Sequence, residues 1–125
     1  MSYTILLCED EEFIARSYSR KLELEGYKVI LAHNGLEALE LFHSEHIDLV
    51  LLDLMMPLKT GFEVLKEIKS DANEDLRKIP VVIASNLSQH SDIEETKKLG
   101  AVDFFVKSNI SLKELVLKVK EHLPK

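Results

Sequence analysis

Acidic residues stand at the ends of two of the most apolar stretches of the chain. Glu9 and Asp10 follow "YTILLC", and Asp53 follows "IDLVLL". Ser85 ends the stretch "PVVIAS", and Lys107 ends "VDFFVK". An unpaired carboxylate inside a protein core costs roughly several kcal/mol. Asp53 therefore needs partners, and the other four residues are the candidates.

The chemistry of these residues points to a divalent cation. Two carboxylates about 4 Å apart repel by roughly 4 kcal/mol at an effective dielectric constant near 20. Lys107 supplies one positive charge to a cluster of Glu9, Asp10 and Asp53, and a metal ion is the natural second. Hard oxygen ligands favour Mg2+ or Mn2+ over zinc, and no Cys/His spacing in the sequence suggests zinc. We therefore expect Mg2+, with Mn2+ as a possible substitute.

The elements that must position this cluster alternate along the chain. Apolar runs rich in β-branched or aromatic residues predict buried strands at 3–8, 27–32, 47–52, 80–85 and 102–107. Apolar residues at helical spacing predict helices at 11–25, 36–46, 61–70, 91–99 and 111–123.

Helix signals refine these boundaries. Ser91–Glu94 and Ser111–Glu114 each have the spelling of an N-terminal capping box. Gly26 and Gly100 each follow a predicted helix and mark its end. The polar stretch 70–78 predicts a surface connection.

Strict alternation of strands and helices predicts an α/β fold. The pattern is (βα)5, a doubly wound parallel five-stranded sheet with helices on both faces and right-handed crossovers. Strand order 2-1-3-4-5 is the common solution at this size. This order brings Glu9, Asp10, Asp53, Ser85 and Lys107 to one edge of the sheet, beyond the carboxyl ends of the strands. The neighbouring Glu11 is better explained as a helix cap.

Composition sets limits on the class of protein. With 125 residues, 46% hydrophobic and 30% charged, the chain has the profile of one soluble globular domain over residues 1–125. The net charge of −6 argues against direct binding to nucleic acid or to an anionic membrane. A single cysteine, Cys8, allows no internal disulfide, and no signal peptide or membrane span is recognisable. We expect a cytoplasmic location.

Four motifs together resemble the receiver domain of two-component response regulators, which has a flavodoxin-like fold. They are "LLCEDEE", "DLVLLDLMMPLKTG", "IPVVIASN" and "GAVDFFVKS", in this order, and they cover essentially the whole chain. The resemblance implies a phosphorelay in which Asp53 becomes a 4-aspartylphosphate. The phosphoryl donor would be a sensor histidine kinase or a histidine phosphotransfer protein, and the signal would pass to an effector protein or output domain. Such a domain catalyses its own modification and is not a turnover enzyme.

The resemblance also implies a set of metal ligands. Asp10, Asp53 and the backbone carbonyl of Met55 would bind Mg2+ directly, and Glu9 would act through a metal-bound water.

Phosphoryl contacts and a switch follow from the same resemblance. Lys107 and the Ser85 hydroxyl would bind phosphoryl oxygens. Ser85 would move toward the phosphoryl group, and Phe104 would rotate inward after it. The face formed by the fourth helix, the fifth strand and the fifth helix would respond.

Three features depart from the usual pattern of this family. Glu9 stands where the family more often has Asp, and its longer side chain still reaches a metal-bound water. Ser108 replaces the usual proline, and a cis bond before a non-proline residue costs about 2.5–4 kcal/mol, which favours a trans Lys107–Ser108 bond. Met55 and Leu87 flank the phosphate position and cannot orient an attacking water, so we expect slow self-dephosphorylation.

Several other functions fit the sequence less well. A flavin-binding relative would need a Gly- or hydroxyl-rich first loop, and "CEDEE" would repel its phosphate. A phosphatase with a nucleophilic aspartate needs a second acid two residues on, where this chain has Met55, and no P-loop is present. The remaining alternative is an interaction module that keeps the receiver shape without phosphorylation. His43 and His46 lie at i, i+3 on the second predicted helix and could bind a metal, but a solvated helix face explains them better. Leu117 is expected at the surface.

Overall fold

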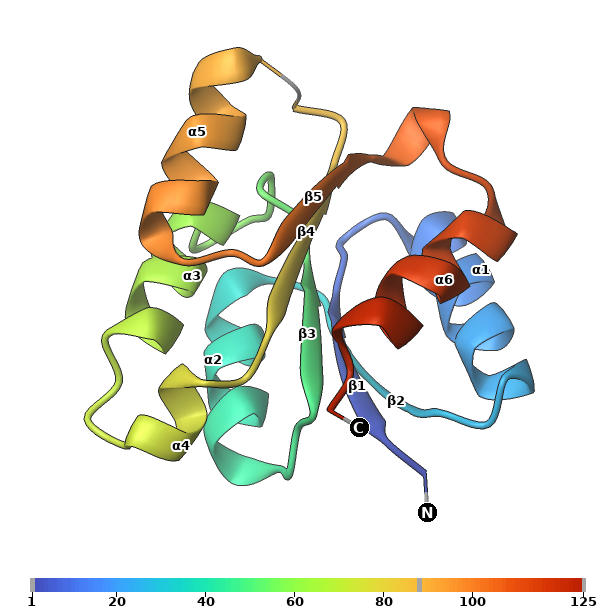
Figure 1. Cartoon of the computed structure of the whole chain (residues 1–125), viewed down its shortest axis with the longest axis horizontal. Helices are drawn as coiled ribbons and strands as arrows, with labels where there is room; N and C mark the ends of the chain where they lie inside the picture. The colour runs from blue at the N-terminus through green and yellow to red at the C-terminus, as the bar shows by residue number, and fades with distance from the viewer. Residues whose placement is uncertain (1, 88, 125) are drawn as a thin grey trace.

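The predicted strands form one parallel sheet in the computed structural model, which describes residues 2–87 and 89–124 (Figure 1). The strands are β1 (Thr4–Cys8), β2 (Lys28–Ala32), β3 (Leu49–Leu52), β4 (Val81–Ser85) and β5 (Asp103–Val106). Their order is β2-β1-β3-β4-β5, and every neighbouring pair is parallel. The predicted α/β class and strand order are therefore confirmed.

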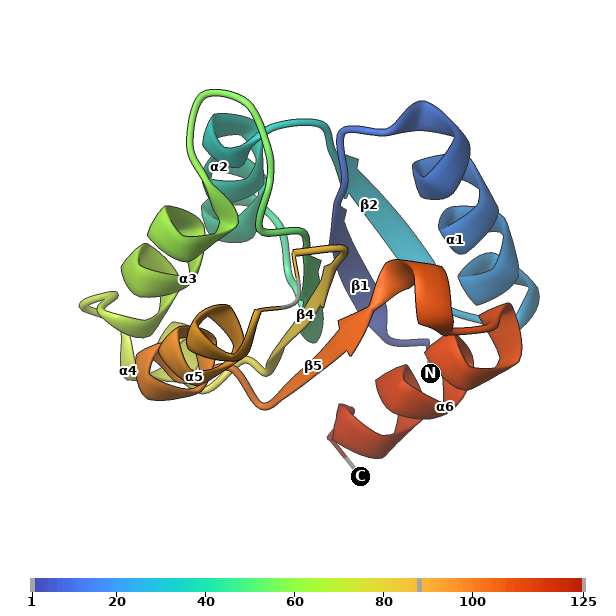
Figure 2. The ribbon, with the colours of Figure 1, turned by 90° about the horizontal axis from the view of Figure 1, so that it is seen from above.

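Helices cover both faces of the sheet. They are α1 (Glu12–Leu24), α2 (Gly35–Ser44), α3 (Gly61–Lys69), α4 (Glu74–Arg77), α5 (His90–Leu99) and α6 (Leu112–His122), with a 3-10 turn, η1, at Lys107–Asn109. In Figures 1 and 2, α1 and α6 lie on one face, and α2, α3 and α5 lie on the other. None of the helices in the described ranges is long and apolar enough to cross a bilayer.

Each face of the sheet carries its own apolar core. Tyr18 and Leu22 of α1 pack with Leu115 and Val119 of α6 against one side of β1, β3 and β4. On the opposite face, the core includes Phe42 of α2 and the buried residues of α3. The strands of the sheet centre are buried because helices cover both of their sides.

Some local predictions were wrong. The stretch 70–78 lies at the surface as predicted, but it also contains an unforeseen one-turn helix, α4. This helix begins after Asn73, whose side chain accepts a hydrogen bond from the Asp75 N–H. A single polar turn carries no periodic apolar signal, so the sequence did not reveal it. The capping box at Ser91 does not form, because α5 begins two residues earlier, after Gln89.

Other helix-end predictions were right. Ser111 and Glu114 form the expected reciprocal cap of α6. Gly100 ends α5 with a φ of 107°, a backbone conformation that glycine adopts without strain. Leu117 is exposed, as expected.

Candidate functional site

The ends of β1, β3, β4 and β5 meet at one edge of the sheet, seen from above in Figure 2. A cavity of about 290 Å3 lies at this edge. Its lining residues come from all four strand ends: Asp10, Glu11, Asp53, Met55, Ser85, Asn86 and Lys107. Glu9 lies beneath them, 2% exposed. The structure thus brings the five sequence-predicted residues together.

A buried ion-pair network lies at the centre of this site. Lys107 Nζ donates hydrogen bonds to Glu9 Oε1 at 2.7 Å and to Asp53 Oδ2 at 3.0 Å. All three side chains are almost inaccessible, at 5%, 2% and 6% exposure for Lys107, Glu9 and Asp53. Charges in such an environment interact strongly, and removal of one partner leaves the others uncompensated.

Burial and hydrogen bonding shift the titration of two members of the network. Burial raises the pKa of the Glu9 carboxyl, and the hydrogen bond from Lys107 opposes that shift only in part. Burial acts to lower the pKa of the Lys107 amine, but its hydrogen bonds to Glu9 and Asp53 outweigh burial and leave that pKa raised. The lysine is therefore a permanent cation at neutral pH.

Backbone groups hold the remaining oxygens of the two buried acids. Asp53 Oδ1 accepts a hydrogen bond from the Met55 N–H at 3.2 Å, and Glu9 Oε2 accepts one from the Glu11 N–H at 3.1 Å. The strand ladder continues through the acids themselves, because the Asp53 N–H donates to the Cys8 carbonyl at 3.1 Å. Within the described residues, no buried side-chain polar atom lacks a partner.

The start of α3 packs directly against Asp53. A Cβ atom at Gly61 would lie 2.2 Å from the Asp53 carbonyl oxygen, so only glycine fits there. The Gly61 N–H donates to the Leu54 carbonyl at 2.9 Å. The loop after β3 therefore returns to within contact distance of the acid from which it started.

The donor set suits a hard divalent cation. Carboxylate oxygens of Glu9, Asp10 and Asp53 all lie within 4.8 Å of one another, and Asp10 is exposed while the other two are buried. Glu11 adds a fourth carboxylate, whose Oε2 lies 3.9 Å from Lys107 Nζ. One lysine cannot balance this negative charge, and oxygen ligands at a solvent-accessible edge are those that Mg2+ prefers. Met55, the predicted carbonyl ligand, lines the same cavity.

A second group of possible ligands has a simpler explanation. Oxygen and nitrogen atoms of Asp103, Glu121 and His122 also lie within 4.8 Å of one another. Asp103 Oδ2, however, already lies 2.9 Å from Lys118 Nζ and 2.9 Å from His122 Nε2. A cation is thus already provided by the chain, and no metal is required there.

The candidate switch residues occupy two different environments. Ser85 is fully buried, and its hydroxyl oxygen accepts a hydrogen bond from the Leu87 N–H at 3.2 Å. Phe104 is partly buried on β5 and packs against the core of the α2, α3 and α5 face. The Lys107–Ser108 peptide bond is trans, as are all others in the described ranges.

Sequence reasoning missed two contributors to the site. Glu11 precedes α1, as predicted for a cap, but its side chain makes no capping hydrogen bond and instead lies near Lys107. Asn86 lines the cavity, and its Oδ1 accepts a hydrogen bond from the Ser108 N–H at 2.9 Å. Its position directly after Ser85 was the only available signal.

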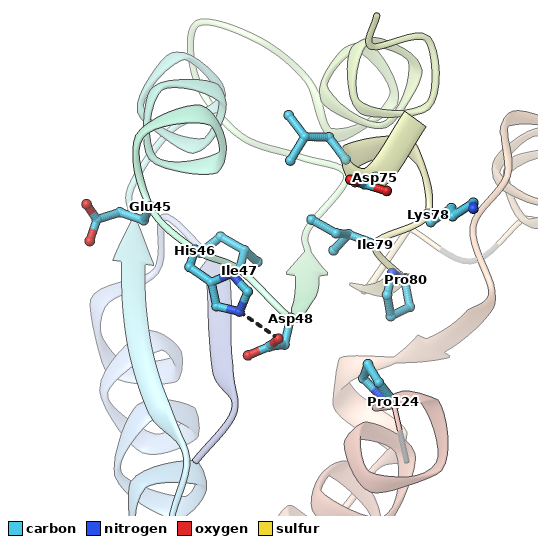
Figure 3. Close-up of a pocket in the computed structure, with 10 residues that line it drawn as sticks. Glu45, His46, Ile47, Asp48, Asp75, Lys78, Ile79, Pro80 and Pro124 are labelled. Carbon is cyan, nitrogen blue, oxygen red and sulfur yellow. Dashed lines mark hydrogen bonds and ion pairs between the residues drawn. The ribbon is translucent and has the colours of Figure 1, made fainter. Parts of the chain in front are cut away.

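A separate groove of about 410 Å3 lies at the amino ends of β3 and β4 (Figure 3). His46 Nε2 lies 3.0 Å from Asp48 Oδ1 on its wall, and Asp48 also accepts the Thr4 N–H. His43 pairs with Asp71 instead. The two histidines therefore face different carboxylates and do not form a shared metal site.

Comparison with protein families matches residues 5–120 to the response regulator receiver domain. The polar-differentiation response regulator DivK of Brucella ovis is 32% identical over 123 residues, which cover 98% of each chain. The probable transcriptional regulator ycf27 of Porphyridium aerugineum is 39% identical over 119 residues, 95% of this chain but 47% of that protein.

Solved structures agree with this assignment. Chemotaxis protein CheY4 of Vibrio cholerae has a TM-score of 0.89 and 26% identity, with 98% of this chain and 100% of that chain covered. The receiver domain of a signal transduction histidine kinase from Syntrophus aciditrophicus has a TM-score of 0.87 and 31% identity, with 98% and 90% covered. Together with the acid and lysine cluster at the carboxyl edge of the sheet, these matches show that the chain belongs to the response regulator receiver-domain family.

Proposed function

We propose that residues 1–125 form a single phosphoacceptor receiver domain in a two-component phosphorelay, with Asp53 as the modified residue. The observation that carries this proposal is the buried Asp53 carboxylate at the cavity, held 3.0 Å from Lys107 Nζ. A carboxylate oxygen of Asp53 attacks the phosphorus atom of a phosphohistidine. The P–N bond breaks as the P–O bond forms, and the product is an acyl phosphate on Asp53.

The protein's part in this reaction is to position and neutralise charge. Phosphoryl transfer passes through a loose in-line transition state, for which orientation and electrostatic stabilisation suffice. Asp10, Asp53 and the Met55 carbonyl would hold Mg2+, with Glu9 behind them acting through water. When bound, the cation would neutralise negative charge on the phosphoryl oxygens. The chain itself modifies Asp53 and is not a turnover enzyme.

Lys107 and Ser85 complete the set of phosphoryl contacts. The Lys107 amine already bridges Glu9 and Asp53, so a phosphoryl group on Asp53 lies within its reach. The Ser85 hydroxyl, at the end of the next strand, donates to a second phosphoryl oxygen. Phe104 then follows Ser85, and the face formed by α5, β5 and α6 changes its partner affinity.

The partners follow from this chemistry. The donor is a sensor histidine kinase or a histidine phosphotransfer protein, and the recipient of the signal is an effector protein or output domain in the cytoplasm. The net charge of −6 disfavours direct contact with nucleic acid or membranes. Met55 and Leu87 offer no polar group to orient water, so the acyl phosphate is lost slowly.

Incubation with acetyl phosphate and Mg2+ tests the proposal. We expect intact mass spectrometry to show one phosphoryl adduct on the wild-type protein and on Asp75→Asn, an exposed control on α4, but none on Asp53→Asn. An undiminished adduct on Asp53→Asn would refute the assignment. No adduct on any variant, with acetyl phosphate or a phosphorylated histidine kinase, favours the alternative of an interaction module that works without phosphorylation.

A further inference from the structure

The strands β4 and β5 end together, and a side chain continues their pairing. The last backbone pair in register is Ser85 with Val106. Beyond it, the Oδ1 atom of Asn86 accepts a hydrogen bond from the Ser108 N–H at 2.9 Å. The two loops that leave β4 and β5, adjacent in Figure 2, are thereby joined between the first residue after β4 and the second residue after β5.

This hydrogen bond fixes the backbone directly after Lys107. β5 is an edge strand that pairs only with β4, and Lys107 is the first residue after it. From there the lysine side chain reaches past the ends of β4 and β3 to Asp53 and to Glu9, which follows β1. A small shift of the Lys107 backbone would move Nζ away from both acids.

Both partners of the junction depend on the residue types at positions 86 and 108. Ser108 can donate because it is not proline, which has no backbone N–H. Asn86 lies on the same turn as Ser85, where the Leu87 N–H donates to the Ser85 hydroxyl oxygen. The side chain of Asn86 thus connects the candidate switch residue to the backbone beside the lysine.

We propose that Asn86 is a positioning residue for phosphoryl transfer to Asp53. By accepting the Ser108 N–H it fixes the backbone that carries Lys107 and so holds Nζ between Glu9 and Asp53. This inference rests on the proposed function for its kinetic consequence, but the position of Lys107 can be measured without phosphorylation.

The test compares variants that remove either the acceptor or only the serine hydroxyl. Asn86→Ala removes the acceptor, Asn86→Leu removes it while keeping a similar volume, and Ser108→Ala keeps the N–H donor. The three variants change two positions, 86 and 108, whose side chains are both exposed, so the fold is retained. The first readout is the hydrogen exchange of the Lys107 amine in 1H–15N spectra, with the signal assigned by its loss in Lys107→Met. The second is the rate of Asp53 phosphorylation by acetyl phosphate at saturating Mg2+.

We expect both Asn86 variants to exchange the Lys107 amine about fivefold faster and to be phosphorylated about fivefold more slowly. This is the change that one solvent-accessible hydrogen bond typically supports. Ser108→Ala should match the wild type in both readouts.

Two results would overturn the inference: Lys107 exchange unchanged in both Asn86 variants, or the same losses in Ser108→Ala as in Asn86→Ala. If the wild type forms no adduct, the proposed function fails. The amine exchange then decides alone whether Asn86 positions Lys107.

Discussion

Lys107 is the only cation within hydrogen-bond distance of Glu9 and Asp53 in the described part of the chain. The three side chains are almost completely buried, so the charged forms are stabilised by one another rather than by water. A buried pair of this kind contributes little net stability compared with an apolar replacement of the whole group. Removing one member is different, because the others then remain buried and unpaired.

Replacement of Lys107 by Met therefore has a clear expected effect. Two buried carboxylates would be left without their cation, and we expect the free energy of unfolding to fall by about 3 kcal/mol at neutral pH. Urea denaturation in the presence of EDTA measures this loss. Lys113→Met, which changes an exposed lysine of α6, should stay within about 0.5 kcal/mol of the wild type. Equal losses in the two variants would contradict the proposed energetic role of the network.

The sequence allowed the acids and the lysine to be predicted as one cluster because parallel strands end at a common edge. It did not allow the particular contacts to be predicted. The direct hydrogen bond from Lys107 Nζ to Glu9 Oε1 was not foreseen. The bond between Asn86 and Ser108 was also not foreseen, because the direction of a loop side chain depends on the neighbouring loop rather than on local sequence.

At the scale of elements, the regular pattern of strands and longer helices was predictable from apolar periodicity. The short helix α4 was not, because a single turn has no periodicity. The start of α5 was misplaced for a related reason. Ser91 spells a cap, but the helix extends to His90, and the sequence contains no signal that distinguishes the two starts.

One contact between elements depends on pH. On α2, His43 Nε2 lies 2.5 Å from Asp71 Oδ2, and His43 Nδ1 lies 2.9 Å from the Leu39 carbonyl oxygen. Two acceptors for the two ring nitrogens favour the protonated imidazole. The hydrogen bond to Asp71, followed by that to Leu39, raises the pKa of His43 above its ordinary value of 6.5.

A raised pKa in the folded state means that this contact stabilises the protein fully below pH 6.5. The contribution is lost as pH rises through the folded-state pKa. At about pH 6 we expect His43→Gln to destabilise the protein by less than about 1 kcal/mol, because the His43 side chain is half exposed. At about pH 9 the loss of stability should be smaller still. Urea midpoints at the two pH values check this. His90→Gln, which has no carboxylate partner among the described residues, is the control, and the same pH trend in both variants would rule out the His43 contact as its cause.

At the scale of the whole molecule, negative charge is the dominant electrostatic feature. The chain carries a net charge of −6, and four acids gather at a single lysine. Folding therefore concentrates charge that the unfolded chain keeps apart. A cation that binds only the folded state stabilises it by mass action.

Removal of Mg2+ should accordingly lower stability. At a hundredfold excess of Mg2+ over its dissociation constant we expect a gain of about 2.7 kcal/mol over the protein in EDTA, at matched ionic strength. Thermal unfolding with increasing Mg2+ measures the gain. Asp10→Asn should lose most of it, whereas Asp75→Asn should keep it. A gain in Asp10→Asn equal to that of the wild type would place the cation elsewhere.

The contact between Gly61 and the Asp53 carbonyl has a mechanical consequence. With a Cβ excluded at 2.2 Å, no side chain lies between the acid and the first residue of α3 as a compressible spacer. Any displacement of the Asp53 backbone therefore displaces the first residue of α3 directly. The same tightness removes evolutionary freedom, since every substitution at position 61 would displace the acid itself.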